Sequence, residues 1–161
     1  GEAGCYAAAD AAFEHLQART DIDKTKIILA GWSLGGAVAI DVASRKKPAG
    51  LAVFSTFSSL AEMGSHTYKI FPAWTLSLIL RHRFDSISKM PGITCPTLIG
   101  HSRADSMIPY FMSDRLAAAA AAPVTRLTID HADHNAFFEE GGSTVLNSIS
   151  SFIESIAKQR D

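Results

Sequence analysis

The stretch that decides the fold is Lys26–Ser44, KIILAGWSLGGAVAIDVAS, in which an apolar run leads into small residues with helical spacing. At its centre, residues 31–35 read Gly-Trp-Ser-Leu-Gly, a G-x-S-x-G pentapeptide. A strand, a sharp turn and a helix are the setting in which such a pentapeptide holds its serine at the tip of a strained turn. We expect Gly31 and Gly35 to provide the space that this turn needs, because neither has a Cβ. The pattern predicts that Ser33 stands exposed at the C-terminal edge of a sheet, as a candidate nucleophile.

The rest of the chain alternates apolar strands with amphipathic helices. Strands are expected at Lys26–Ala30, Leu51–Ser55, Pro96–Gly100 and Thr125–Asp130. Helices are expected at Glu2–Arg19, Leu34–Lys46, about Pro109–Ala121 and Ser143–Lys158. Strands that alternate with helices form parallel sheets with helices on both faces. We therefore expect a single α/β domain over residues 1–161, with a mostly parallel sheet of about four strands.

One segment interrupts this alternation. Leu60–Phe84 lies between the second and third expected strands, is longer than a crossover needs and is rich in apolar residues. Such insertions often cover a binding site as a cap, and an apolar cap would favour an apolar substrate. A helix pair that packs on the sheet without contacting a ligand is an equally consistent interpretation. The sequence predicts a helical insertion here and leaves both roles open.

Composition and charge narrow the class of protein. The chain has a formal net charge of −1, with 47% hydrophobic and 19% charged residues, so it lacks the basic surface that nucleic-acid binding needs. The two cysteines, Cys5 and Cys95, have neither metal-ligand nor disulfide-framework spacing, which favours a reducing compartment. Gly1–Asp10 does not resemble a secretory leader, and the most apolar stretch is too short to span a bilayer. We expect a soluble cytoplasmic protein.

Two further residues complete a possible catalytic set with Ser33. A serine hydroxyl needs a base to take its proton and a carboxylate to orient that base. Because the carboxyl ends of parallel strands meet at one edge of a sheet, these partners are sought in the loops that follow the strands. Asp105 follows the third expected strand, and His134 follows the fourth. The chain order serine, aspartate, histidine is that of hydrolases built on a nucleophile elbow.

These features resemble the alpha/beta-hydrolase superfamily, within its esterase, lipase and thioesterase-like branch. The matching segments are Lys26–Ser44, Ile93–Pro109 and Ile129–Asn135. The resemblance implies that Ser33 is the nucleophile, Asp105 the acid and His134 the base. It also implies that the Leu34 amide donates one hydrogen bond to the oxyanion. The activity implied is hydrolysis of an ester, thioester or related acyl bond through a serine acyl-enzyme, without metal or cofactor.

Each of these assignments has an alternative. Ser33 could be a turn serine in a glycine-rich packing segment, and Asp105 could cap the helix that follows it. His131 lies three residues before His134, but the family pattern of a small residue, an acidic residue and histidine fits Ala132-Asp133-His134. The other acidic residues of this loop, Asp130 and Asp133, are expected to be solvated or to act as caps. The remaining histidines are interpreted as structural: His15, His66, His82 and His101.

The resemblance covers the second half of the superfamily's fold. The sheet of the superfamily usually has about eight strands, and a loop after an early strand supplies a second oxyanion donor. This chain is expected to hold the last four strands, so that strand Lys26–Ala30, normally central, would have an unpaired edge. We expect a second copy of the chain to cover that edge across a two-fold axis, which makes the protein a homodimer or a higher oligomer.

Two functions of different kinds are consistent with these observations. The first is a serine hydrolase of carboxylic esters or thioesters that acts on a small-molecule substrate. The second is a catalytically weak or inactive half-domain that serves as a binding or self-assembling module. A peptidase would use the same three residues. A dehalogenase-like reaction would need a carboxylate at position 33, where this sequence has a hydroxyl.

Overall fold

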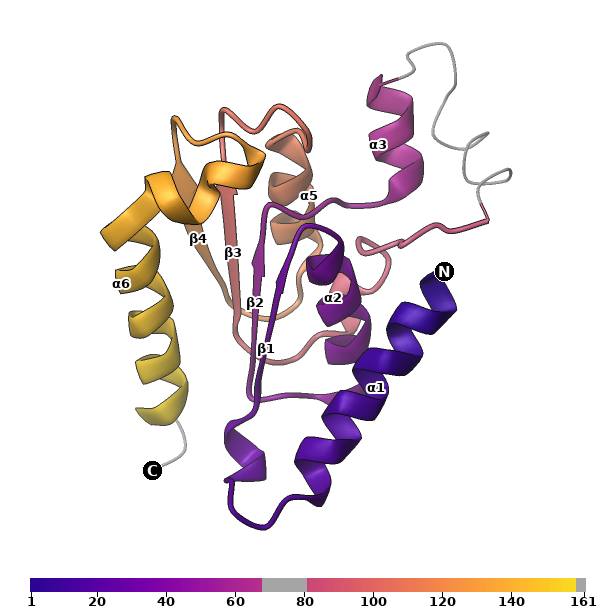
Figure 1. Ribbon diagram of the computed structural model, residues 1–161, viewed down its shortest axis with the longest axis vertical. Helices are drawn as coiled ribbons and strands as arrows, with labels where there is room; N and C mark the ends of the chain where they lie inside the picture. Colours follow the sequence, from indigo (N-terminus) through magenta and orange to yellow (C-terminus); the bar gives the residue numbers. More distant parts are fainter. Residues whose placement is uncertain (68–80, 159–161) are drawn as a thin grey trace.

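The computed structural model describes residues 1–67 and 81–158 and contains one sheet of four parallel strands in the order β1-β2-β3-β4 (Figure 1). The strands are β1 (Ile28–Trp32), β2 (Gly50–Phe54), β3 (Thr97–Ser102) and β4 (Val124–Ile129). Their order in space follows their order in the chain, and every neighbouring pair is parallel. This is the parallel α/β arrangement that the sequence predicts.

Helices cover both faces of the sheet. They are α1 (Glu2–Ala18), α2 (Leu34–Lys46), α3 (Leu60–Thr67), α5 (Phe111–Ala119) and α6 (Phe137–Lys158), with short 3-10 turns at Lys24–Lys26, Met90–Gly92 and His134–Ala136. Figure 1 shows α6 on one face of the sheet, and α1, α2 and α5 on the opposite side. Because each strand is followed by a helix, the loops at the carboxyl ends of the strands gather at one edge of the sheet.

Strand β2 explains why the core forms as it does. All five residues of β2 are buried, and the strand reads GLAVF without a polar side chain. Ala52 and Phe54 face the cluster built around α6, whereas Leu51 and Val53 pack with α2 on the other face. A strand that is covered on both faces needs apolar residues in succession rather than in alternation.

The last helix is longer than the sequence predicts. It begins at Phe137 rather than at Ser143, but Gly142 within it has a φ of 44° and interrupts the helical backbone. A positive φ is accessible to glycine without a steric penalty. The predicted start at Ser143 therefore coincides with the second, straight part of a kinked α6.

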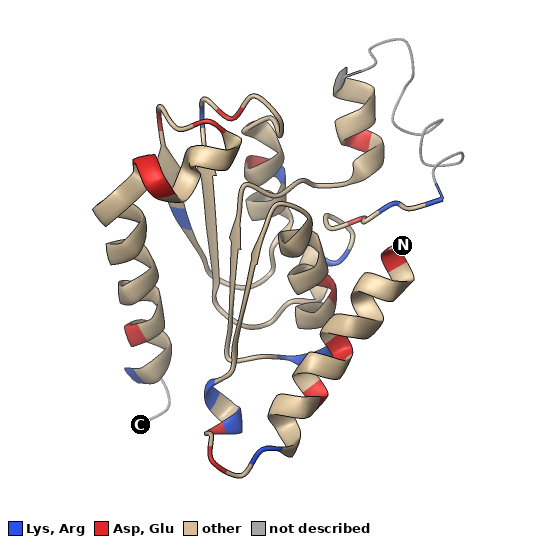
Figure 2. Ribbon diagram, viewed as in Figure 1, with Lys and Arg blue, Asp and Glu red and all other residues tan. Residues whose placement is uncertain are grey.

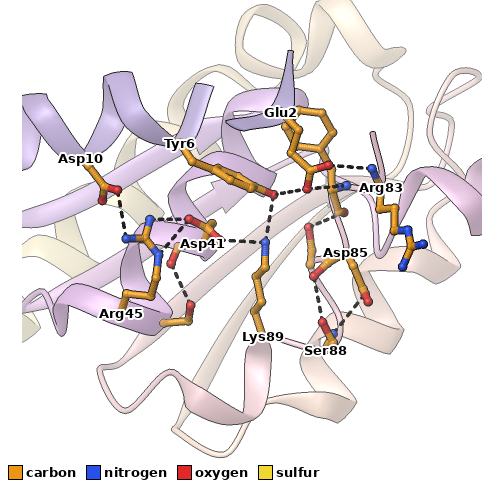
Figure 3. Close-up of polar contacts among 12 residues, drawn as sticks. Glu2, Tyr6, Asp10, Asp41, Arg45, Arg83, Asp85, Ser88 and Lys89 are labelled. Atoms are coloured by element: carbon orange, nitrogen blue, oxygen red, sulfur yellow. Dashed lines mark hydrogen bonds and ion pairs between the residues drawn. The ribbon is translucent and has the colours of Figure 1, made fainter. Parts of the chain in front are cut away.

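The expected insertion Leu60–Phe84 is only described at its two ends. Its first part forms α3, and residues 68–80 lie outside the described residues. The returning end is attached to α1, because the Glu2 carboxylate accepts hydrogen bonds from the amides of Arg83 and Phe84 at 2.7 and 3.0 Å (Figure 3). The cap and packing interpretations of this insertion both depend on residues outside that description.

A polar network joins α1, α2 and the segment before β3 (Figure 3). Lys89 Nζ lies 2.8 Å from Asp41 Oδ1 and donates to the Tyr6 hydroxyl at 2.9 Å. The Tyr6 hydroxyl in turn donates to Glu2 at 2.8 Å, and Arg45 pairs with Asp41. Burial and the neighbouring Glu2 carboxylate raise the pKa of Tyr6, which keeps it a donor. The network ties the first helix to the body of the fold.

None of the helices in residues 1–67 and 81–158 combines the length and the apolar character needed to cross a membrane.

Candidate active site

The backbone at Ser33 forms the strained turn that the pentapeptide predicts. Ser33 connects β1 to α2 with φ 53° and ψ −123°, a backbone conformation that residues other than glycine rarely adopt. Two hydrogen bonds hold it there: the Ser33 amide donates to the Phe54 carbonyl at 2.9 Å, and Thr56 Oγ1 donates to the Ser33 carbonyl at 2.8 Å. The end of the neighbouring strand β2 and Thr56, two residues after it, therefore fix the turn.

The glycines that this turn requires are partly different from those expected. A Cβ on Gly31 would lie 2.2 Å from the Gly35 carbonyl oxygen, so position 31 has to be glycine as predicted. A Cβ on Gly35, by contrast, would meet nothing within 4 Å in the described part of the chain. The second close approach belongs to Gly36, whose Cβ would lie 2.6 Å from the Thr56 Cβ. The expected role of Gly35 in making space is therefore wrong, because the crowded side of the helix is the one that faces Thr56.

The structure brings Ser33, Asp105 and His134 together at the carboxyl ends of three different strands. The Ser33 hydroxyl lies 3.1 Å from His134 Nε2, and Asp105 Oδ2 lies 2.8 Å from His134 Nδ1. Because a carboxylate only accepts, Nδ1 carries the hydrogen that Asp105 binds, which leaves Nε2 of a neutral ring free to accept from the serine. The three residues thus form a continuous hydrogen-bonded chain, although 101 positions separate Ser33 from His134.

Asp105 is fixed by hydrogen bonds on both of its oxygens. Oδ1 accepts from the amides of Met107 and Ile108 at 2.9 and 2.8 Å, and the side chain is fully buried. Burial alone would raise the pKa of this carboxyl, but hydrogen bonds from His101, the Ile108 amide and His134 outweigh it and lower the pKa of Asp105 to about 2. Asp105 is therefore an anion at neutral pH, as a group that orients an imidazole must be.

His134 begins a short 3-10 turn that leads into α6 and is 3% exposed. Its amide donates to Asp133 Oδ1 at 2.7 Å, and the same Asp133 oxygen accepts from the Ser106 amide and hydroxyl. Asp133 is thus a capping residue, as expected, and it also joins the loop of the acid to the loop of the base. The Trp32 ring stacks on the imidazole with a centroid separation of 5.1 Å, a contact that the sequence does not reveal.

The Leu34 amide occupies the first position of α2, immediately after Ser33. Amides in the first turn of a helix have no acceptor within that helix and carry the positive end of the helix dipole. The position is therefore suited to bind a negative oxygen that forms at a carbon attached to Ser33 Oγ.

The structure separates the alternatives around this site. His131 is exposed, and Asp130 is an exposed residue paired with Arg103 at 3.2 Å. Of the histidines interpreted as structural, His101 departs from that expectation. It lies 3.3 Å from Asp105 Oδ2, and the sequence hides this contact because the chain turns back on itself after β3. Within the described residues, no group of three or more His, Cys, Asp or Glu side chains is placed to hold a metal ion.

Comparison with known proteins identifies the family. The model of the prolyl oligopeptidase family matches residues 4–159. An uncharacterized protein of Mycobacterium tuberculosis is 35% identical over 156 residues, which are 97% of this chain and 54% of that protein. Alpha/beta hydrolase domain-containing protein aho-3 of Caenorhabditis elegans is 33% identical over 134 residues, which are 83% of this chain and 38% of that protein. The chain thus spans about half the length, or less, of these curated relatives.

Solved structures share the fold. Est1E from Butyrivibrio proteoclasticus matches with a TM-score of 0.76 and 16% identity, over 95% of this chain and 69% of that one. An acetyl xylan esterase from Paenibacillus sp. R4 matches with a TM-score of 0.73 and 18% identity, over 94% of this chain and 51% of that one. The parallel sheet, the turn at Ser33 and the family match agree, and the chain belongs to the prolyl oligopeptidase family of alpha/beta hydrolases.

Proposed function

We propose that this chain is a serine hydrolase of carboxylic esters or thioesters. The observation that carries the proposal is the hydrogen-bonded chain from Asp105 through His134 to Ser33, with both links within 3.1 Å. In this mechanism, Ser33 Oγ attacks the acyl carbonyl carbon while His134 Nε2 takes its proton. The imidazolium then donates that proton to the leaving alcohol or thiol, and Asp105 stabilises its charge. Water repeats the sequence on the acyl-enzyme and releases the acid.

Stabilisation of the oxyanion supports the same proposal. The Leu34 amide, at the first position of α2, is placed to donate a hydrogen bond to the tetrahedral intermediate. Loss of one such donor costs on the order of 10²–10³ in rate in other hydrolases.

A fluorophosphonate probe tests the proposal directly, because it reacts only with an activated serine. We expect stoichiometric labelling of the wild-type protein and none of Ser33→Ala. Ser148→Ala is the matched control, since this half-buried serine on α6 donates its hydrogen bond to the Thr144 carbonyl of its own helix. Hydrolysis of p-nitrophenyl esters then measures turnover. If circular dichroism shows that the protein is folded and it still does not react with the probe, the proposal is contradicted.

The second candidate function is self-assembly, and the unpaired edge of β1 favours it. Among the strands of residues 1–67 and 81–158, β1 has a partner on one side only, and it carries no charged side chain (Figure 2). Apolar hollows flank it on both faces, one beside α6 and one beside α1 and α2. The residues that line these hollows are uncharged. Two copies of this edge can therefore pair with each other without charge repulsion, and we propose a second copy of the chain as the partner.

Sedimentation velocity tests this second candidate. We expect a dimer at micromolar concentrations, with β1 strands antiparallel across a two-fold axis near Ala30. A monodisperse monomer at high concentration would contradict self-assembly and leave the hydrolase proposal untouched.

A further inference from the structure

A second histidine faces the carboxylate that holds the base. His101 lies in β3 and is 1% exposed. Its Nε2 is 2.9 Å from the Ile108 carbonyl oxygen and 3.3 Å from Asp105 Oδ2. Because a carbonyl oxygen can only accept, the hydrogen of this ring lies on Nε2, between the two oxygens. The Asp105 oxygen in question is the same one that binds His134 Nδ1.

The His101 ring has little freedom to leave this position. It packs edge-on against Tyr110, with ring centroids 5.8 Å apart and planes at 69°. Nδ1 is buried and has no hydrogen-bond partner in the described part of the chain. Within that part, the polar contacts of the ring are therefore made by Nε2. A buried polar ring held in this way fixes the direction in which its single N–H points.

We propose that His101 is a positioning residue for the hydrolase reaction. Its Nε2–H holds Asp105 Oδ2 in the position from which that oxygen orients His134. His101 therefore acts on Ser33 indirectly, through the side chains of Asp105 and His134. The expected effect of His101 on the reaction rate rests on the proposed function. The expected effect of His101 on the hydrogen bond between Asp105 and His134 does not require that the protein turns over a substrate.

Three variants separate positioning from packing. His101→Leu keeps the approximate volume and removes the donor, whereas His101→Gln returns an N–H near the place of Nε2. Thr97→Val is the matched control, because Thr97 is equally buried in the same strand and loses a hydrogen bond to the Cys95 carbonyl far from Asp105. If His101→Leu does not fold, His101→Asn replaces it, since its shorter amide does not reach the position of Nε2.

The first readout is kinetic. We expect His101→Leu to lower kcat for p-nitrophenyl acetate, and the rate of Ser33 labelling, by about ten- to hundred-fold with KM little changed, the size of one lost hydrogen bond to a charged group. His101→Gln should recover most of that loss, and Thr97→Val should match the wild type. Equal losses in all three variants would show a packing role and overturn the proposal.

The second readout needs no substrate. The proton between His134 Nδ1 and Asp105 gives a low-field NMR signal when the hydrogen bond is held, and this signal should shift or broaden in His101→Leu and reappear in His101→Gln. An unchanged signal in His101→Leu would overturn the proposal. If the wild-type protein neither labels nor turns over, the hydrolase proposal fails, while this signal still decides whether His101 positions Asp105.

Discussion

Asp105 couples the candidate site to the stability of the fold. Its pKa is about 2 in the folded protein, below the ordinary value of 3.8. A carboxyl whose folded pKa is depressed stabilises the native state above its unfolded pKa, and this contribution disappears as the pH falls through the folded pKa. For Asp105 the contribution is about 2 kcal/mol, present above about pH 4 and lost by about pH 2.

We therefore expect Asp105→Asn to lose less stability in acid than the wild type. The free energy of unfolding of the variant should be lower than that of the wild type at neutral pH. This gap between the two proteins should narrow by about 2 kcal/mol between about pH 5 and pH 2. Urea unfolding at several pH values measures the gap. Asp130→Asn is the control, because that exposed carboxylate pairs with an exposed arginine and such a pair contributes little. A gap that stays constant with pH would contradict the assignment.

Single residues also show where sequence reasoning succeeds and where it stops. Ser33, Asp105 and His134 could be chosen because the order of loops after parallel strands constrains where side chains converge. Trp32 on His134 and His101 on Asp105 could not, because both contacts depend on side-chain directions that no spacing rule supplies. The roles of Gly35 and Gly36 differ for the same reason: only the structure shows which one faces Thr56.

At the scale of elements, α1 depends on polar contacts as well as on its apolar stripe. Phe13 is its one buried residue in the described structure, and the stripe packs against α2. Glu2 and Tyr6 attach its start to residues 82–84 and to Lys89 by hydrogen bonds that span 80 to 83 positions. Helix propensity predicts that α1 forms, whereas these long-range bonds decide where it lies.

Lys89 is the position at which this attachment can be tested. Lys89→Met keeps the aliphatic length and removes the ammonium that binds Asp41 and Tyr6, and we expect it to lower the free energy of unfolding by about 1–3 kcal/mol. Amide hydrogen exchange in α1 should rise most. Lys158→Met is the control, because its exposed pair with Glu154 at 3.9 Å contributes little. Equal effects of the two substitutions would show that the network does not anchor α1.

Element boundaries followed the sequence most closely where apolar patterning and chain breakers agree. Helix α2 runs from Leu34 to Lys46 as predicted, since the turn at Ser33 starts it and Lys47, with a φ of 51°, ends it before Pro48. The strand boundaries shift by one or two residues, because the apolar pattern marks which residues are buried but not where pairing with the next strand begins. The kink at Gly142 hides the first turn of α6 from the same pattern.

At the scale of the whole molecule, the two edges of the sheet are unlike. The outer strand β4 includes Arg126, which pairs with Asp114, and such charges discourage further pairing. In β1, Ala30 and Trp32 are exposed and the strand has no charge. The parallel order of the four strands was predictable from their alternation with helices, but what covers the β1 edge is not encoded in that alternation.

Ala30→Pro tests the self-assembly proposal at this edge. The Ser33 amide bonds to β2, so alternation along the strand directs the Ala30 amide away from β2. Proline there removes an outward donor and leaves the β1–β2 pairing in place. We expect the variant to be monomeric where the wild type is dimeric, with Ala30→Ser, which keeps the N–H, as the control. Sedimentation that does not distinguish the two variants would exclude pairing through this edge.

The stacking of Trp32 on His134 gives the molecule an internal optical reporter. Indole emission responds to a nearby charge and to the mobility of a ring in contact with it, and this indole is part of the same pentapeptide as Ser33. We therefore expect acylation of this hydroxyl in the proposed reaction, or protonation of the imidazole, to change the light that the protein itself emits, so that the reaction can be followed in a fluorimeter without an added dye.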